Sequence, residues 1–154
     1  MTFKKSELKA ALLGGVIAEA AFELYAWLLS PLIFGLELQP AKLVMALFEK
    51  YLNISLSYQS AFGIHTFIGI VGFSLFILAL YKAFSLKPYV IGLAGGVGLW
   101  FFAQGVLAPA IGRKFMMEFG AYTQSSFIGH VGMALILVMI IDWVLKKDSN
   151  EQMV

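Results

Sequence analysis

Cysteine is absent from this 154-residue chain, and charged residues make up only 13% of it. Without cysteine the chain can form neither disulfides nor thiolate metal ligands. The net charge is only +2 and no basic stripe with interleaved aromatic residues occurs, so no nucleic-acid partner is expected. Hydrophobic residues, in contrast, make up 60% of the chain, and the mean hydropathy is +0.86. This composition lies outside the soluble globular range and predicts a membrane protein in contact with the lipid bilayer.

Sequence signatures of the common hydrolytic enzymes are also missing. The chain has no phosphate-binding glycine loop, no zinc-protease motif and no catalytic nucleophile beside an activating base. The polar segments between the apolar runs are too short to form a soluble domain. No catalytic residue is therefore assigned, the question of enzymatic activity stays open, and any chemistry is expected in or beside the membrane.

Four apolar runs of about twenty residues each fit helices that cross a bilayer. They are predicted at about residues 8–30, 60–81, 89–111 and 124–145. The first is too long for the apolar part of a signal peptide, and we expect it to be retained. Pro31 is expected to end it, because proline disfavours helix in the preceding residue. The fold prediction is an all-α membrane protein, a four-transmembrane-helix bundle forming a single integral membrane domain over residues 1–154.

An amphipathic segment, at about residues 40–51, lies between the first and second spans. Pro40 suits the first position of a helix, and apolar and charged residues then fall on opposite sides. The apolar side holds Leu43, Val44, Leu47, Phe48 and Tyr51, and the charged side holds Lys42, Glu49 and Lys50. The pattern predicts a short helix that lies in the membrane interface or packs over the span ends. In either position it would cover the outer mouth of the bundle.

Lysine and arginine are distributed unevenly between the two sides of the predicted bundle. Positive residues favour the cytoplasmic side of short loops. Seven would lie on the side of the termini, namely Lys4, Lys5, Lys9, Lys82, Lys87, Lys146 and Lys147. Four would lie on the other side, namely Lys42, Lys50, Arg113 and Lys114. We therefore predict a multi-pass membrane protein with both termini cytoplasmic.

Polar residues recur at one depth in all four spans. With a rise of about 1.5 Å per residue, His65 lies about 8 Å from the outer end of its span and His130 about 10 Å. Glu23 and Gln104 each lie about 12 Å deep, and Glu19 lies about one turn deeper. Ionisable residues at such depth are costly and mark functional sites. We predict that these side chains converge on one polar site in the outer half of the membrane.

A metal site is the first chemistry that fits this layer. Its predicted ligands are Glu23, His65 and His130, which suit zinc, iron or copper and leave a coordination position open. The residues expected around them, as orienting partners or as part of a proton cluster, are Glu19, Gln104 and Trp100. A transition-metal ion is thus one candidate cofactor.

Three other interpretations stay open. Haem b could be held by His65 and His130, with neighbouring glycines making room for the porphyrin. Glu19, Glu23 and the two histidines could instead form a proton-responsive cluster, since histidine titrates near neutrality. Finally, the polar layer could join helices in a non-catalytic accessory subunit of a larger membrane complex, or in a homo-oligomer.

Short motifs in all four apolar runs form a recognisable set. They are Gly14-Gly15-Val16-Ile17 with Glu19, Gly63-Ile64-His65, Gln104 followed by Pro109 and Gly112, and Phe127-Ile128-Gly129-His130. From about residue 11 to 147 this set resembles the YagU-like family of small bacterial inner-membrane proteins. The resemblance implies an association with acid tolerance in enteric bacteria, no assigned biochemistry, and a match of the family's two histidines to His65 and His130. A family member has histidine where this chain has Gln104, so a three-histidine site is not expected here.

Overall fold

The computed structural model describes residues 2–151, with side chains for residues 2–148. Over these residues the chain forms helices and no strands. Four helical segments within this range are long and apolar enough to cross a membrane. The prediction of an all-α bundle with four membrane spans is confirmed, and the chain is a multi-pass membrane protein.

The first three spans are each interrupted by a π-helical turn, whereas the fourth is one continuous helix. The first consists of α1 (Lys5–Leu24), η1 (Tyr25–Leu29) and α2 (Ser30–Phe34), the second of α4 (Tyr58–Phe67), η2 (Ile68–Phe73) and α5 (Ser74–Ala83), and the third of α6 (Pro88–Phe101), η3 (Phe102–Leu107) and α7 (Ala108–Ala110). The 3₁₀ helix η4 (Phe115–Phe119) then leads into α8 (Ala121–Glu151). The hydrophobic pattern predicts the spans but not these turns.

Pro31 does not end the first span, contrary to the prediction, and the helix continues to Phe34. The reason lies in η1, which directly precedes the proline. A π turn widens the helix and takes backbone groups out of the regular α-helical ladder, so the missing N–H and the ring of Pro31 are accommodated at the start of α2. The helix ends instead at Gly35, which has a left-handed φ of 68°.

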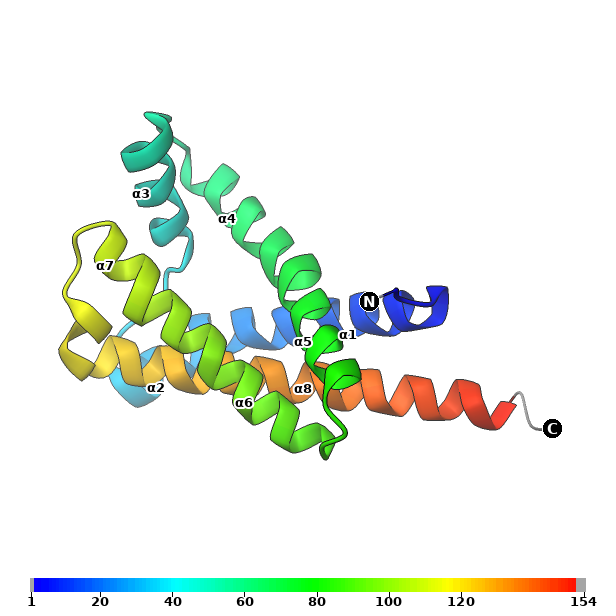
Figure 1. The fold of residues 1–154 in the computed structure, drawn as a ribbon. Coiled ribbons are helices and arrows are strands. Elements are labelled where there is room, and N and C mark those ends of the chain that lie inside the picture. The colour runs from blue at the N-terminus through cyan, green and yellow to red at the C-terminus, as the bar shows by residue number, and fades with distance from the viewer. Residues whose placement is uncertain (1, 152–154) are drawn as a thin grey trace.

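The core of the bundle is formed around α8. Helices α1 and α6 make the most extensive contacts with it, and Leu137, Val138 and Ile141 of α8 are fully buried. The ribbon shows α1 and α6 on either side of α8, with both termini at the end of the molecule opposite α3 and α7 (Figure 1). The arrangement makes α8 the element against which the other spans are positioned.

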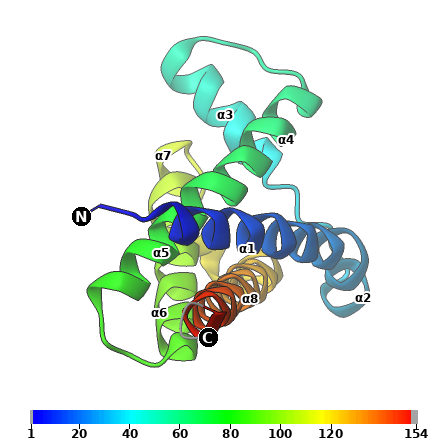
Figure 2. The ribbon, with the colours of Figure 1, turned by 90° about the vertical axis from the view of Figure 1, so that its right-hand side faces the viewer.

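The predicted amphipathic segment is helix α3 (Ala41–Leu52). It packs on α4, where Ala41 and Val44 meet Ala61 in a small apolar cluster. The Tyr51 hydroxyl donates to the carbonyl oxygen of Ala110 at 2.9 Å. Helix α3 therefore links the ends of the second and third spans, and with the adjoining part of α4 it stands apart from α8 in both views (Figures 1 and 2).

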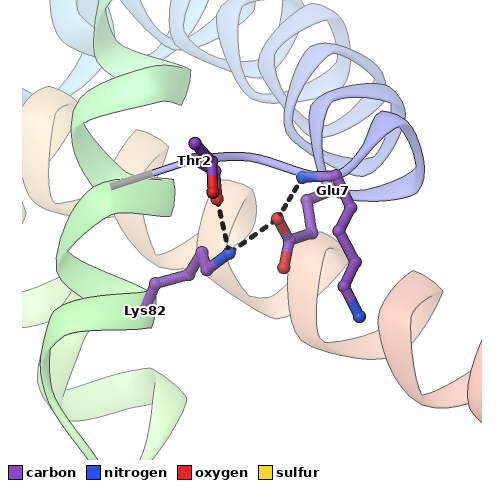
Figure 3. Close-up of polar contacts among 4 residues, drawn as sticks. Thr2, Glu7 and Lys82 are labelled. Atoms are coloured by element: carbon purple, nitrogen blue, oxygen red, sulfur yellow. Dashed lines mark hydrogen bonds and ion pairs between the residues drawn. The ribbon is translucent and has the colours of Figure 1, made fainter.

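At the opposite end, one lysine holds the start of the chain against the second span. Lys82 Nζ donates to the Thr2 carbonyl oxygen at 3.2 Å and to a Glu7 carboxylate oxygen at 2.8 Å (Figure 3). The same Glu7 oxygen accepts the Lys4 backbone N–H at 2.6 Å, at the first turn of α1. These contacts pair charges where the spans leave the apolar layer.

Glycines of α6 let the third span approach α8 closely. A Cβ placed on Gly96 would lie 2.7 Å from Val131 Cα and 3.0 Å from the His130 carbonyl oxygen. By contrast, a Cβ on Gly98 would meet no described atom within 4 Å. Close backbone contact of this kind is how membrane helices associate when no hydrophobic force drives them together.

We expect Gly96→Ala to destabilise the protein by about 1–3 kcal/mol, because the added methyl group overpacks the contact with α8. Gly98→Ala is the matched control on the same helix, and it should be neutral or slightly stabilising because alanine is the better helix former. Thermal unfolding of both variants in detergent measures the difference. Equal stability of the two would contradict the close packing of α6 on α8.

Candidate functional site

Glu19, Glu23 and His65 meet where the first span faces the second, and we call them the Glu–His cluster. His65 Nε2 lies 3.8 Å from a Glu19 carboxylate oxygen and 3.9 Å from one of Glu23. One ligand atom from each of the three residues lies within 4.8 Å of the other two. Two carboxylates and one imidazole from neighbouring spans thus converge on a small volume.

The polar atoms of the Glu–His cluster are buried and largely unpaired. Glu19 is only 3% exposed. Both of its carboxylate oxygens, Glu23 Oε1 and His65 Nε2 have no hydrogen-bond partner among the described residues. An ionised carboxylate buried without a partner costs several kcal/mol. The cluster therefore needs a counter-charge, which either a cation or a proton can supply.

Trp27 orients one member of the cluster. Its indole N–H donates to Glu23 Oε2 at 2.8 Å, across one helical turn. Glu23 and Trp27 are four residues apart, and residues with this spacing share a helix face. The bond leaves the other oxygen of Glu23 directed toward His65.

Two glycines bring the backbones of the first two spans together at the cluster. A Cβ on Gly69 of η2 would overlap the Glu19 carboxylate. One turn before Glu19, a Cβ on Gly15 would overlap the Ser74 hydroxyl and the Ile70 carbonyl oxygen. The Glu19 carboxylate thus lies in the space that glycine leaves open on the facing helix. The sequence shows these glycines, but it does not show which side chain lies against them.

The π-helical turns lie beside the polar residues. Turn η1 begins just after Glu23, turn η2 just after His65, and turn η3 contains Gln104. Such turns occur frequently at functional sites because they redirect side chains and disturb the regular backbone hydrogen bonds. No feature of the hydrophobic pattern identifies them.

His130 and Gln104 line a cavity of about 240 Å³ that His65 also borders. His130 Nδ1 lies 2.8 Å from the Ser126 carbonyl oxygen and must donate to it, because a carbonyl only accepts. The other ring nitrogen, Nε2, is then an acceptor, and the described part of the chain offers it no donor. The cavity therefore presents an unpaired histidine nitrogen.

Gln104, which also lines the cavity, carries a second unpaired acceptor. The residue is 5% exposed, and its amide nitrogen donates to Ser126 Oγ at 3.2 Å. Its Oε1 is buried and has no partner in the range that the structure describes. The Ser126 side chain thus orients Gln104 with its carbonyl oxygen free.

The predicted polar layer is divided into two neighbouring groups. Glu23 and His65 lie together. Glu19, which was expected around the metal ligands, lies within ligand distance of both. His130 does not belong to the group within ligand distance, and the Phe22 ring packs against both histidines, with its centroid 5.9 Å from each of their ring centroids.

Trp100 lies outside both groups. Its indole N–H donates to the Thr123 carbonyl oxygen at 3.0 Å, and its ring packs edge-on against Phe127. These contacts join the third span to the start of α8. Among the described residues Trp100 makes no hydrogen bond or ring contact with the Glu–His cluster, and its expected role beside the metal ligands stays a prediction.

Comparisons with protein-family models, curated proteins and solved structures found no match. The resemblance to the YagU-like family therefore stays a prediction from the sequence motifs. The Glu–His cluster and the adjoining cavity are the features of the structure that bear on function.

We expect Gly69→Ala to destabilise the protein by about 1–3 kcal/mol, because the new methyl group competes with the Glu19 carboxylate for space. In a Glu19→Ala background the same substitution should cost little, since the space is then vacant. The double-mutant cycle, measured by chemical unfolding in detergent, should show a coupling of at least about 0.5 kcal/mol.

Gly72→Ala is the matched control within η2. Its Cβ would lie 3.5 Å from the Ile68 side chain, an ordinary contact. Its effect should be the same with and without Glu19. If the stability change caused by Gly69→Ala were also the same with and without Glu19, the Glu19 carboxylate would not lie against Gly69.

Proposed function

We propose that the protein binds a divalent transition-metal ion inside the membrane through Glu19, Glu23 and His65. The observation that carries this proposal is the convergence of three ligand groups, one buried and two half-buried, with ligand atoms that lie within 4.8 Å of one another and lack hydrogen-bond partners among the described residues. Imidazole and carboxylate together suit zinc, iron and manganese. A bound cation would also supply the counter-charge that the buried carboxyls require.

The distances in the Glu–His cluster suit such an ion after a small closing movement. With metal–ligand distances of about 2.1 Å, the ligand atoms of a tetrahedral site are about 3.4 Å apart. His65 Nε2 lies 3.8 Å from Glu19 Oε1 and 3.9 Å from Glu23 Oε1, and both distances exceed this value only slightly. The indole of Trp27 holds Glu23 from outside, as groups that orient metal ligands commonly do.

The geometry supports Glu19, rather than His130, as the third ligand. His130 is tied through Nδ1 to Ser126 and does not belong to the group of ligand atoms that lie within 4.8 Å of one another. A haem held by His65 and His130 has weaker support, because the Phe22 ring packs against both histidines and fills space that a porphyrin would need. We therefore favour a metal ion over haem b.

A proton-responsive function is the second candidate. It is favoured by Glu19, whose buried carboxyl must carry a proton whenever no cation neutralises it. Metal and protons compete for the same ligand atoms, so one cluster would serve both functions. This candidate also agrees with the acid-tolerance association that the YagU-like resemblance implies.

The bacterial inner membrane, with both termini cytoplasmic, is the location we propose. The excess of lysine at the end that carries both termini supports it. The Glu–His cluster would then lie in the outer half of the bilayer. Ions or protons would reach it from the periplasmic side.

Substitution of any cluster residue is expected to weaken metal binding. Glu19→Gln, Glu23→Gln and His65→Ala should each lower the affinity for Zn²⁺ by at least about 10-fold. Removal of a group that only orients a metal ligand already lowers metal affinity by about 10-fold to 100-fold. Glu49→Gln, at an exposed position on α3, is the matched control and should bind like the parent protein. Calorimetric titration of detergent-solubilised protein measures the affinity.

The same titration should show weaker Zn²⁺ binding as the pH falls from about 7 to about 5, because the ligand atoms must lose their protons to bind metal. Circular dichroism of each variant separates loss of a ligand from loss of fold. Unchanged affinity in all three folded cluster variants would refute the metal site. Loss of binding in His130→Ala alone would move the site to the cavity.

The visible absorption spectrum of the purified protein tests the choice between metal ion and haem. We expect no Soret band, either as isolated or after reduction with dithionite. A Soret band that sharpens on reduction and disappears in His65→Ala would overturn the choice and make the protein a b-type cytochrome.

A further inference from the structure

We propose that the cavity lined by His130 and Gln104 binds a ring hydroxyl, either the head of a membrane hydroquinone or a free phenol. This site adjoins the Glu–His cluster but does not depend on a bound metal. It therefore adds a small-molecule ligand to the proposed metal-binding function.

The size of the cavity limits the ligand to a single ring. Its volume is about 240 Å³. A cavity of about 150 Å³ in another protein holds one benzene molecule. The cavity thus accommodates a six-membered ring with a few substituents, but not a fused multi-ring system.

The polar groups of the cavity select a neutral hydrogen-bond donor. The two unpaired acceptors are His130 Nε2 and Gln104 Oε1, whereas Nδ1 and one N–H of the amide nitrogen donate to Ser126. An anion in hydrogen-bonding contact with these two acceptors would be repelled by them. A cation is disfavoured because Arg113 also lines the cavity. A hydroxyl group satisfies the two acceptors without introducing a charge.

Aromatic and aliphatic side chains form the rest of the wall. Phe22, Phe73 and Phe102 contribute rings that a flat ligand can stack on or meet edge-on. Leu43 and Leu47 of α3 close the cavity on another side. This combination of a mostly apolar wall with a few converging polar groups is typical of small-molecule sites.

Phe102 indicates the direction of entry. Its side chain lines the cavity, yet the residue is 52% exposed on the outside of the third span. The wall is therefore one side chain thick where the third span faces lipid. A ligand dissolved in the bilayer would enter there, and a long tail could remain among the lipids.

Three matched probes test the proposal: 4-propylphenol, 4-propylanisole, which lacks the donor, and propylbenzene, which lacks the oxygen. Binding is measured by saturation-transfer NMR with protein in lipid nanodiscs after removal of metal with a chelator, and empty nanodiscs correct for partition into lipid. We expect saturable binding with 4-propylphenol about 10-fold tighter than the other two, the difference made by one buried hydrogen bond. Because no metal is present, the result is independent of the proposed metal site.

Variants connect the preference to the cavity. Gln104→Leu should reduce the affinity for 4-propylphenol by about 10-fold and leave that for propylbenzene nearly unchanged. Gln124→Leu, at an exposed position early in α8, is the matched control. Ala103→Phe should fill the cavity and remove the binding of all three probes. If Gln104→Leu does not fold, His130→Leu provides the same comparison.

A hydroquinone with a decyl tail distinguishes the two sources of the ligand. Tighter binding than 4-propylphenol, after correction for lipid partition, indicates a membrane hydroquinone, and equal binding indicates a free phenol. No saturable binding of any probe would overturn the proposal and assign the two acceptors to water. Equal affinity for phenol and propylbenzene would also overturn it, because the acceptors would then play no part.

Discussion

The Glu19 carboxyl group is buried between two membrane helices, against a glycine and beside a histidine, with no hydrogen-bond donor in reach among the described residues. Several features of the protein follow from this one group. The facing helix must have no side chain at Gly69, the two backbones must be close, and a positive charge or a proton must be present. Lipid could not provide any of these, so the first two spans can only pack with this face inward.

The two halves of the bundle are built differently. Toward the termini the spans pack closely on α8, where glycines of α6 and alanines of α1 allow close contact around the buried residues Leu137, Val138 and Ile141. Toward the other end, α3 and α4 stand apart from α8 (Figure 2), and His130 lines a cavity. A closely packed half near the termini that holds a more open half at the other end is a suitable frame for a ligand site.

Hydrophobicity alone was sufficient to predict the four spans and the amphipathic helix α3, and the polar residues within the spans pointed to Glu23, His65, Gln104 and His130. It could not predict how these residues divide, because depth depends on the position along a helix whereas contact also depends on the direction around it. Three π-helical turns change that direction, and they leave no mark on the hydrophobic pattern. The same turns explain why Pro31, a reliable helix stop in isolation, lies inside a helix here. The role of Glu19 was underestimated for a related reason, since only the packing of Gly69 reveals it.

The π-helical turn η2 also limits how the chain can change in length. One residue of an α-helix corresponds to a rotation of about 100°. Deleting a single residue from Ile68–Phe73 would therefore turn the half of the span that carries His65 by about that angle against the half that carries Ser74. Every amino acid of the Glu–His cluster would still be present, yet the imidazole would point away from the carboxylates. For this protein the number of residues between its polar groups is as much a part of the site as their identity.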